Sequence, residues 1–252
     1  MKRILSLLLI VLCAAVSCSS KPQRYGIRVV REYNHDETSY TQGLFFHEGT
    51  LFESTGQYGE STMREVELES GKALRRVDFA RKYFAEGSVI MGDRLYILTW
   101  TNKVAFVYDP ATFEYKGSYS YPREGWGLTT DGKSLIASDG SAHLYFYDGE
   151  FRQQRMVTVR YDGRPIKLLN ELEWVDGKVW ANVYTSDLIL IINPEDGEVE
   201  GVVDCSGLLP DKLRDNRTDV LNGIAVNDGR IYLTGKYWKR LYEVELVPQK
   251  EK

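Results

Sequence analysis

The sequence contains few of the residues that bind metal ions or form disulfides. Only three of its 252 residues are cysteines and three are histidines. His35, His47 and His143 are far apart and show no metal-ligand spacing, so no metal site is predicted. Cys205 is the one cysteine beyond residue 18, which excludes a disulfide within the folded part of the chain. It lies in a β-rich run with no histidine nearby, and we interpret it as a packing residue.

An excess of positive charge is also missing. The formal net charge is −4, and loss of Lys2 and Arg3 with a signal segment takes it from −4 to −6. Proteins that bind nucleic acids neutralise phosphates with a basic face. The charge balance therefore argues against nucleic acid as a partner.

Long apolar runs are absent except at the N-terminus. Residues 4–16 are almost entirely apolar, follow the basic pair Lys2 and Arg3, and precede small residues. The run is shorter than the roughly 20 residues that span a bilayer, and the whole pattern is typical of a secretory signal. Residues 1–20 are therefore predicted to be a signal peptide, and residues 21–252 the exported, folded domain.

Residues 15–18 (AVSC) resemble a bacterial lipobox, in which the cysteine is diacylated and becomes the new N-terminus. This resemblance predicts a lipoprotein that contacts the membrane only through a lipid on Cys18. Its location is then periplasmic or membrane-anchored. The alternative is ordinary signal cleavage nearby, with Cys18 lost or left free.

What the sequence does contain is one short pattern that recurs five times. Each copy has a turn with Gly, Asp or Glu, followed by apolar and aromatic residues of a β-rich run, as in a hairpin. The copies are residues 47–52, 91–96, 131–136, 176–180 and 228–232. Counted from Leu51, Leu95, Leu135, Val179 and Ile231, the spacings are 44, 40, 44 and 52 residues.

Further β-rich runs follow the turns, so that each repeat holds about four strands. A period of about 40 residues with four strands is that of a β-propeller blade. Residues 25–31 have no repeat of their own, and residues 241–247 end the last repeat one strand short. We predict an all-β, five-bladed β-propeller whose last blade is closed by the N-terminal strand, which removes an exposed edge. A two-sheet sandwich is the competing all-β fold, but it requires no fixed period.

Several residues near the repeat starts are candidates for chemistry. Glu86 has aromatic neighbours and a following glycine, and apolar surroundings raise a carboxyl pKa toward neutrality. Three tryptophans are candidate pocket walls, although tryptophan more often fills gaps between blades. Polar residues recur beside them, although they could equally cap strand ends. The tryptophans are Trp100, Trp126 and Trp180, and the polar residues are Gln42, Asn170, Asn222 and Lys236.

Nine short motifs, in order along the chain, resemble the plant and bacterial glutaminyl-peptide cyclotransferases. They are residues 40–44 (YTQGL), 53–59 (ESTGQYG), 84–87 (FAEG), 98–100 (LTW), 125–129 (GWGLT), 138–141 (SDGS), 170–174 (NELEW), 221–225 (LNGIA) and 234–236 (TGK). Ala85 and Tyr40 stand where that family often has glycine and phenylalanine. The resemblance implies a five-bladed propeller that needs no metal or cofactor and converts N-terminal glutamine of peptides or proteins to pyroglutamate.

The resemblance also implies roles for individual residues. Glu86 matches the catalytic glutamate that moves a proton from the α-amine to the departing ammonia. Gln42, Asn170 and Lys236 match groups that bind the γ-amide and its oxyanion. Trp100, Trp126 and Trp180 match aromatic walls, and Glu53 and Arg64 match supporting positions.

Two alternatives to a cyclase remain open from the sequence. One is a non-catalytic propeller lipoprotein that binds a peptide or other ligand at the same channel mouth, because a fold does not determine a function. The other is a metal-dependent hydrolase, which requires a carboxylate or histidine cluster on the axis. A monomer is expected in either case.

Overall fold

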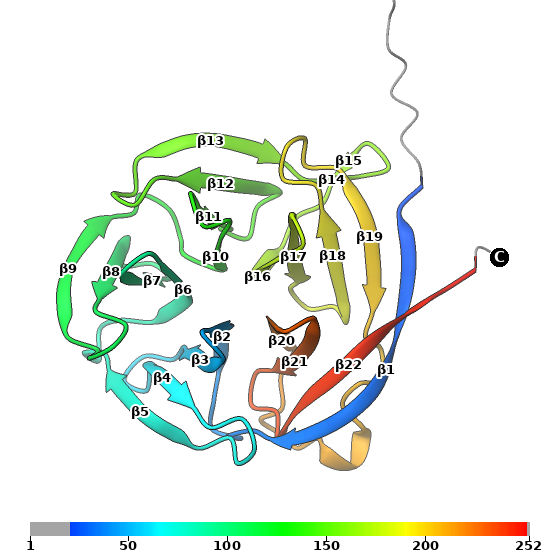
Figure 1. Ribbon diagram of the computed structural model, residues 1–252, viewed down its shortest axis with the longest axis horizontal. Helices are drawn as coiled ribbons and strands as arrows, with labels where there is room; N and C mark the ends of the chain where they lie inside the picture. Colours follow the sequence, from blue (N-terminus) through cyan, green and yellow to red (C-terminus); the bar gives the residue numbers. More distant parts are fainter. Residues whose placement is uncertain (1–20, 251–252) are drawn as a thin grey trace, which may run out of the picture.

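The computed structural model describes residues 21–250, and its regular secondary structure is β-strand apart from one short helix, as the predicted all-β class requires (Figure 1). The predicted signal peptide, residues 1–20, and the predicted lipidation site Cys18 lie outside the described residues. The longest insertion between repeats contains one short 3-10 helix, η1 (Asp211–Leu213). Within residues 21–250, no helix has the length and apolar character needed to cross a membrane.

Three sheets have four antiparallel strands each, in chain order. The first holds β2 (Thr41–His47), β3 (Thr50–Thr55), β4 (Thr62–Val66) and β5 (Ala73–Asp78). The second holds β6 (Ala85–Met91), β7 (Arg94–Thr99), β8 (Val104–Tyr108) and β9 (Tyr115–Ser120). The third holds β10 (Leu128–Thr130), β11 (Leu135–Ala137), β12 (His143–Tyr147) and β13 (Gln153–Thr158). A small two-stranded sheet, β14 (Arg160–Tyr161) and β15 (Arg164–Pro165), follows.

The remaining strands form one eight-stranded sheet in the order β16-β17-β18-β19-β1-β22-β21-β20. Its members are β1 (Gln23–Asn34), β16 (Leu169–Val175), β17 (Lys178–Val183), β18 (Leu188–Ile192), β19 (Val199–Asp204), β20 (Leu221–Asn227), β21 (Arg230–Gly235) and β22 (Arg240–Pro248). β1 pairs antiparallel with β22 along most of its length and parallel with β19 at its start. The predicted pairing of the two terminal runs is therefore confirmed.

The sheets are arranged like the blades of a propeller around a central axis, with β2, β6, β10, β16 and β20 nearest the axis (Figure 1). Their burial follows from this arrangement. Inner strands such as β6 are buried on both faces, whereas the outer strands β5 and β9 alternate between exposed and half-buried residues. A strand with neighbouring sheets on both sides needs apolar residues throughout, whereas an outer strand needs them on one face only.

Apolar side chains from facing sheets pack in clusters between them. Phe45 and Phe52 of the first sheet, for example, share a cluster with Ile90 and Ile97 of the second. The innermost strands approach so closely that some positions admit only glycine. A Cβ on Gly127 would lie 2.0 Å from the carbonyl oxygen of Asn170, which is far inside van der Waals contact.

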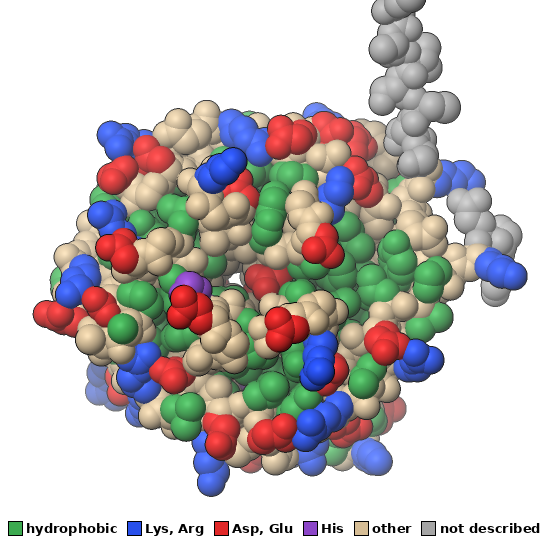
Figure 2. Space-filling model, viewed as in Figure 1, with side chains coloured by type: hydrophobic (Ala, Val, Ile, Leu, Met, Phe, Trp, Pro, Cys, Tyr) green, Lys and Arg blue, Asp and Glu red, His purple; other side chains and the backbone are tan. Residues whose placement is uncertain are grey.

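The inner strand β16 carries two buried carboxylates, Glu171 and Glu173. The space-filling view shows a narrow hollow at the centre of the molecule (Figure 2). Glu171 accepts hydrogen bonds from the backbone N–H groups of Leu44 (3.3 Å) and Ile224 (3.0 Å), and so links β16 to β2 and β20. Glu173 accepts one from Val226 N–H at 3.1 Å. Burial raises the pKa of Glu171 well above its ordinary value, and it raises the pKa of Glu173 to about 8.

Glu173 should make stability fall as pH rises. The pKa of Glu173 is about 8 in the folded protein, against an ordinary value of 4.5. The contribution of this shift to the free energy of unfolding is therefore complete below pH 4.5 and is lost as the pH rises through 8. Gln at this position keeps the acceptor for Val226 and does not titrate. We expect the melting temperature of the wild type to fall, relative to that of Glu173→Gln, between about pH 5 and about pH 9. Parallel melting curves for the two proteins would contradict this.

Candidate functional site

The candidate site is built from equivalent positions of five hairpins, β2–β3, β6–β7, β10–β11, β16–β17 and β20–β21. At the start of each first strand, or just before it in the case of β10, stands one residue whose side chain is polar or aromatic. These residues are Gln42, Glu86, Trp126, Asn170 and Asn222. In every hairpin but β10–β11, the strand register shifts at this residue. A shift of register bends the strand and re-aims a side chain that the regular pleat would direct elsewhere.

A second set of residues follows the second strand of each hairpin, at the same end of the sheets. It consists of Gly56, Trp100, Asp139, Tyr184 and Lys236. Because the strands of a hairpin run in opposite directions, the start of the first strand lies beside the end of the second. The two sets therefore meet around one end of the axis.

Several members of the two sets, together with neighbouring aromatic and polar residues, line a pocket with a volume of about 360 Å³. It is lined by Tyr40, Gln42, Gln57, Tyr58, Phe84, Glu86, Trp100, Trp126, Asn170, Tyr184 and Lys236. The structure thus brings together Gln42, Glu86, Trp100, Trp126, Asn170 and Lys236. Of the other candidates for pocket walls and polar groups, Trp180 and Asn222 do not line the pocket, and Asn222 instead donates to the backbone oxygen of Thr41 at 2.9 Å.

Trp180 does not line this pocket, and its assignment as a wall is corrected here. It lies in the middle of β17, is 6% exposed, and packs with Ile189, Val203 and other apolar residues of a core cluster. Tyr184, four residues further along the chain, occupies the wall position instead. Tyr184 immediately follows β17, as Trp100 follows β7, so position within the repeat would have identified it where residue type did not.

Glu86 is the acidic side chain of the pocket. It is 4% exposed, and within residues 21–250 no group donates a hydrogen bond to its carboxylate. Burial raises its pKa well above the ordinary value; the Lys236 ammonium opposes this shift, and the Glu124 carboxylate adds to it. A carboxyl group with a raised pKa holds a proton more readily than an exposed one, which suits a group that must both accept and release a proton.

Lys236 is the basic side chain of the pocket and is 3% exposed. Burial lowers its pKa, while the carboxylates of Glu86 and Asp219 oppose that shift. Its Nζ lies 4.6 Å from the ring centroid of Tyr40 and 5.1 Å from that of Tyr184. Cation–π attraction of this kind stabilises a desolvated ammonium group while leaving its N–H donors free for a ligand.

Two carboxamides complete the polar wall. The side-chain oxygen of Asn170 is buried and has no hydrogen-bond partner among residues 21–250. The side-chain oxygen of Gln42 accepts a long hydrogen bond, 3.4 Å, from Asn222 Nδ2. Buried polar atoms are normally paired, so an unpaired amide at a pocket indicates a place for a ligand's polar group.

The remaining walls are aromatic. The indole N–H groups of Trp100 and Trp126 both donate to Glu124 Oε2, at 2.9 and 3.3 Å. Phe84 packs edge-on against Trp100, with ring centroids 5.5 Å apart. Gly56 makes this packing possible, because a Cβ there would lie 2.2 Å from Cε1 of Phe84.

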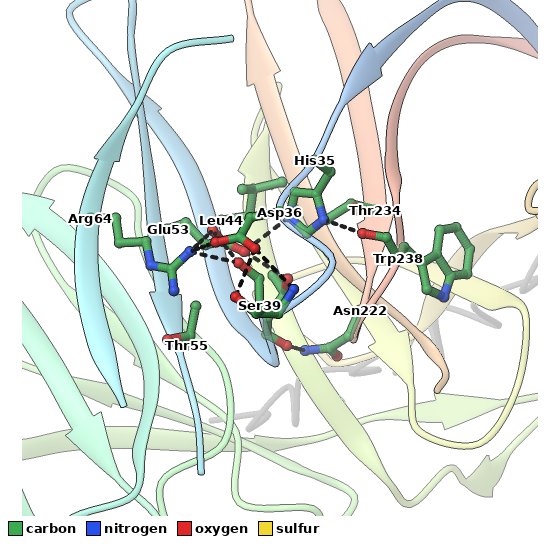
Figure 3. A network of polar contacts seen from close by, with 12 residues as sticks. His35, Asp36, Ser39, Leu44, Glu53, Thr55, Arg64, Asn222, Thr234 and Trp238 are labelled. Atoms are coloured by element: carbon green, nitrogen blue, oxygen red, sulfur yellow. Dashed lines mark hydrogen bonds and ion pairs between the residues drawn. The ribbon is translucent and has the colours of Figure 1, made fainter. Parts of the chain in front are cut away.

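Glu53 and Arg64 lie outside the pocket, in a buried polar network beside it (Figure 3). Glu53 accepts hydrogen bonds from Ser39 Oγ (3.1 Å) and Thr41 Oγ1 (2.7 Å), and pairs with His35 Nε2 at 3.0 Å. Arg64 lies 3.9 Å from Glu53 and donates to Ser39 Oγ at 2.9 Å. The network anchors the segment that leads from β1 into β2, and with it the pocket residues Tyr40 and Gln42.

Charges within this network stabilise one another. Burial alone lowers the pKa of His35, but the neighbouring Glu53 carboxylate reverses the effect, so the pKa is raised overall. Burial alone raises the pKa of Glu53, but His35 and Arg64 outweigh it and hold the pKa below its ordinary value. The network is therefore a buried group of opposite charges.

Within residues 21–250, neither the pocket nor the polar network around Glu53 gathers side chains in the way a metal ion requires. In the part of the chain that the structure describes, no group of three or more His, Cys, Asp or Glu side chains is arranged to hold a metal ion.

Comparisons with a family model, a curated relative and a solved structure all point to the same family. The family model described as glutamine cyclotransferase matches residues 3–246. The chain belongs to the glutamine cyclotransferase family. It is 42% identical over 232 residues to a glutaminyl-peptide cyclotransferase of Arabidopsis thaliana, covering 87% of this chain and 71% of that one. The crystal structure of Myxococcus xanthus glutaminyl cyclase superposes with a TM-score of 0.85 at 38% identity, covering 91% of this chain and all of the other.

Removing the charge of Glu53 should destabilise this member of the family. Glu53→Gln leaves His35 without its buried counter-charge, whereas Arg64 keeps its ion pair with Asp36 at 2.7 Å. Breaking a buried pair from one side costs about 3 kcal/mol of unfolding free energy. Urea denaturation at neutral pH measures the loss. Glu65→Gln is the matched control, because Glu65 pairs with Arg75 at 2.6 Å in a far more exposed place of the same sheet. That change should cost less than about 1 kcal/mol; equal losses in the two variants would refute the assignment.

Proposed function

We propose that this protein is a glutaminyl-peptide cyclotransferase that converts the N-terminal glutamine of peptides and proteins to pyroglutamate. In this reaction the α-amine nitrogen attacks the γ-carbonyl carbon, a new C–N bond closes the five-membered ring, and the bond to the amide nitrogen breaks. The amide nitrogen leaves as ammonia after gaining one proton. Family membership supports the proposal. The single observation that carries it is a buried Glu86, whose carboxylate accepts no hydrogen bond from residues 21–250, in a pocket that also holds Lys236 and two carboxamides.

Glu86 moves the proton in the proposed mechanism. As a carboxylate it accepts a proton from the α-amine while the ring closes, and as a carboxylic acid it donates that proton to the departing nitrogen. One group can serve both steps because its pKa is raised toward the pH at which the reaction runs. No metal ion or cofactor takes part in these steps.

Lys236, Asn170 and Gln42 bind the γ-amide. The Lys236 ammonium stabilises the negative charge that develops on the γ-oxygen in the tetrahedral stage. The two carboxamides hold the amide group in one orientation. Trp100, Trp126 and Tyr184 enclose the aliphatic part of the glutamine in a curled conformation, and holding two reacting groups together removes much of the barrier.

The fold that carries this site is, in this proposal, a five-bladed propeller. The eight-stranded sheet is then two four-stranded blades, β16 to β19 and β20 to β22 with β1, that share the edge between β19 and β1. The five equivalent hairpins support this count.

The first test is ammonia release from a short peptide with N-terminal glutamine, using purified residues 21–252 in the presence of EDTA. The wild type should release ammonia, and Glu86→Gln should lose at least about 100-fold in rate, because general acid–base catalysis contributes that much or more. Glu195→Gln, at an exposed residue outside the pocket, should act like the wild type. A wild type that acts on no glutamine peptide would favour a binding lipoprotein, and loss of activity in EDTA would favour a metal-dependent enzyme.

We further propose export, with anchoring through a lipid on Cys18. The apolar N-terminal run and the AVSC motif support it. Full-length protein expressed in a bacterium should label with radioactive palmitate and fractionate with membranes, whereas Cys18→Ala should do neither. Equal labelling of the two proteins would contradict the assignment of Cys18, and unlabelled wild type would favour ordinary cleavage.

A further inference from the structure

Glu124 connects two walls of the pocket without lining it. It lies in the segment between β9 and β10, two residues before Trp126. Its Oε2 accepts the indole N–H of Trp100 at 2.9 Å and that of Trp126 at 3.3 Å. Trp100 follows β7 of the second sheet, and Trp126 precedes β10 of the third. One carboxylate oxygen therefore joins aromatic walls contributed by two different sheets.

This link matters most for Trp100. Its side chain is 37% exposed, and its ring packs edge-on against Phe84. An indole has a single polar atom, the Nε1–H donor, so a hydrogen bond there selects one orientation of the ring. The orientation of the Trp126 ring depends less on this hydrogen bond. That ring also packs edge-on against Tyr184, with ring centroids 5.6 Å apart, and against Gly140.

Glu124 also acts on the pocket through its charge. It adds to the effect of burial on the pKa of Glu86, and the ammonium of Lys236 opposes both. The other titratable side chains that line the pocket are Tyr40, Tyr58 and Tyr184. Among these groups, Glu124 supplies a negative charge that favours the protonated form of Glu86.

We propose that Glu124 is a positioning residue for the cyclisation: it clamps Trp100 and Trp126 by their indole N–H groups and so holds the slot that keeps the glutamine side chain curled. This inference rests on the proposed function. In this proposal Glu124 itself does not contact the substrate. The clamp requires a hydrogen-bond acceptor at this position, whereas the influence on Glu86 requires a charge.

Two variants separate these requirements. Glu124→Gln keeps an oxygen that can accept both N–H groups but removes the charge, and Glu124→Ala removes both. We expect kcat of Glu124→Ala to fall about 10- to 100-fold, because a small displacement of positioning groups has effects of that size. Glu124→Gln should stay within about fivefold of the wild type, since a neutral acceptor bonds somewhat more weakly than a charged one.

The pH profile provides the second readout. Both variants lack the negative charge near Glu86, so the acid limb of kcat/KM should shift to lower pH in both, and by a similar amount. Glu195→Ala, which removes an exposed glutamate outside the pocket, should change neither kcat nor the profile. Melting temperatures should agree among all these proteins, because Glu124 is exposed.

A third readout does not depend on activity. Release of Trp100 in Glu124→Ala should increase quenching of tryptophan fluorescence by acrylamide, and Glu124→Gln should not. If Glu124→Ala were as active as an active wild-type protein, the inference would be overturned and the proposed function would stand. The same conclusion would follow if Glu124→Ala and Glu124→Gln lost activity equally. A wild type without cyclase activity would overturn the proposed function itself, and quenching would then test the clamp alone.

Discussion

The close approach of the innermost strands around the central axis is the constraint on which the rest of the structure depends. Gly127 can pass β16 only because it has no side chain. Where β16 itself presents Glu171 to the axis, backbone N–H groups of β2 and β20 satisfy the carboxylate. Neighbouring sheets are thus held close together near the axis, and shifts of strand register occur at one end of the inner strands. Those shifts direct Gln42, Glu86, Asn170 and Asn222 toward one another.

Two groups of buried charges lie side by side and serve opposite purposes. In the network of His35, Glu53 and Arg64, each charge has a partner, which suits a group that holds a segment in place. In the pocket, the Glu86 carboxylate accepts no hydrogen bond from residues 21–250, and Lys236 faces aromatic rings. Leaving ionisable groups under-satisfied costs stability, and such groups concentrate where a ligand or a reaction completes them. The contrast distinguishes the supporting glutamate from the proposed catalytic one, although the sequence shows both only as glutamates in strands.

The sequence predicted the pairing of the terminal strands and most of the pocket, because these depend on repeated local patterns. Each turn and each strand end recurs at a nearly constant spacing, and equivalent positions in a repeat meet in space. The assignment of Trp180 was wrong for a related reason. It relied on residue type, whereas the position that faces the pocket is four residues later and carries Tyr184. Glu124 was missed because an acidic residue in an exposed segment is ordinary; only the two indole N–H groups converging on it make it unusual.

The sequence by itself determined the all-β class, the repeat, and the family to which the chain belongs, since period, turn residues and ordered motifs are local properties that survive without coordinates. The tertiary structure decided which side chains share a cavity, which carboxylates are paired, and which pKa values move. Those outcomes depend on contacts between sheets that are distant in the chain, and on the removal of water from around individual charges. Neither is encoded in the spacing of residues along one strand.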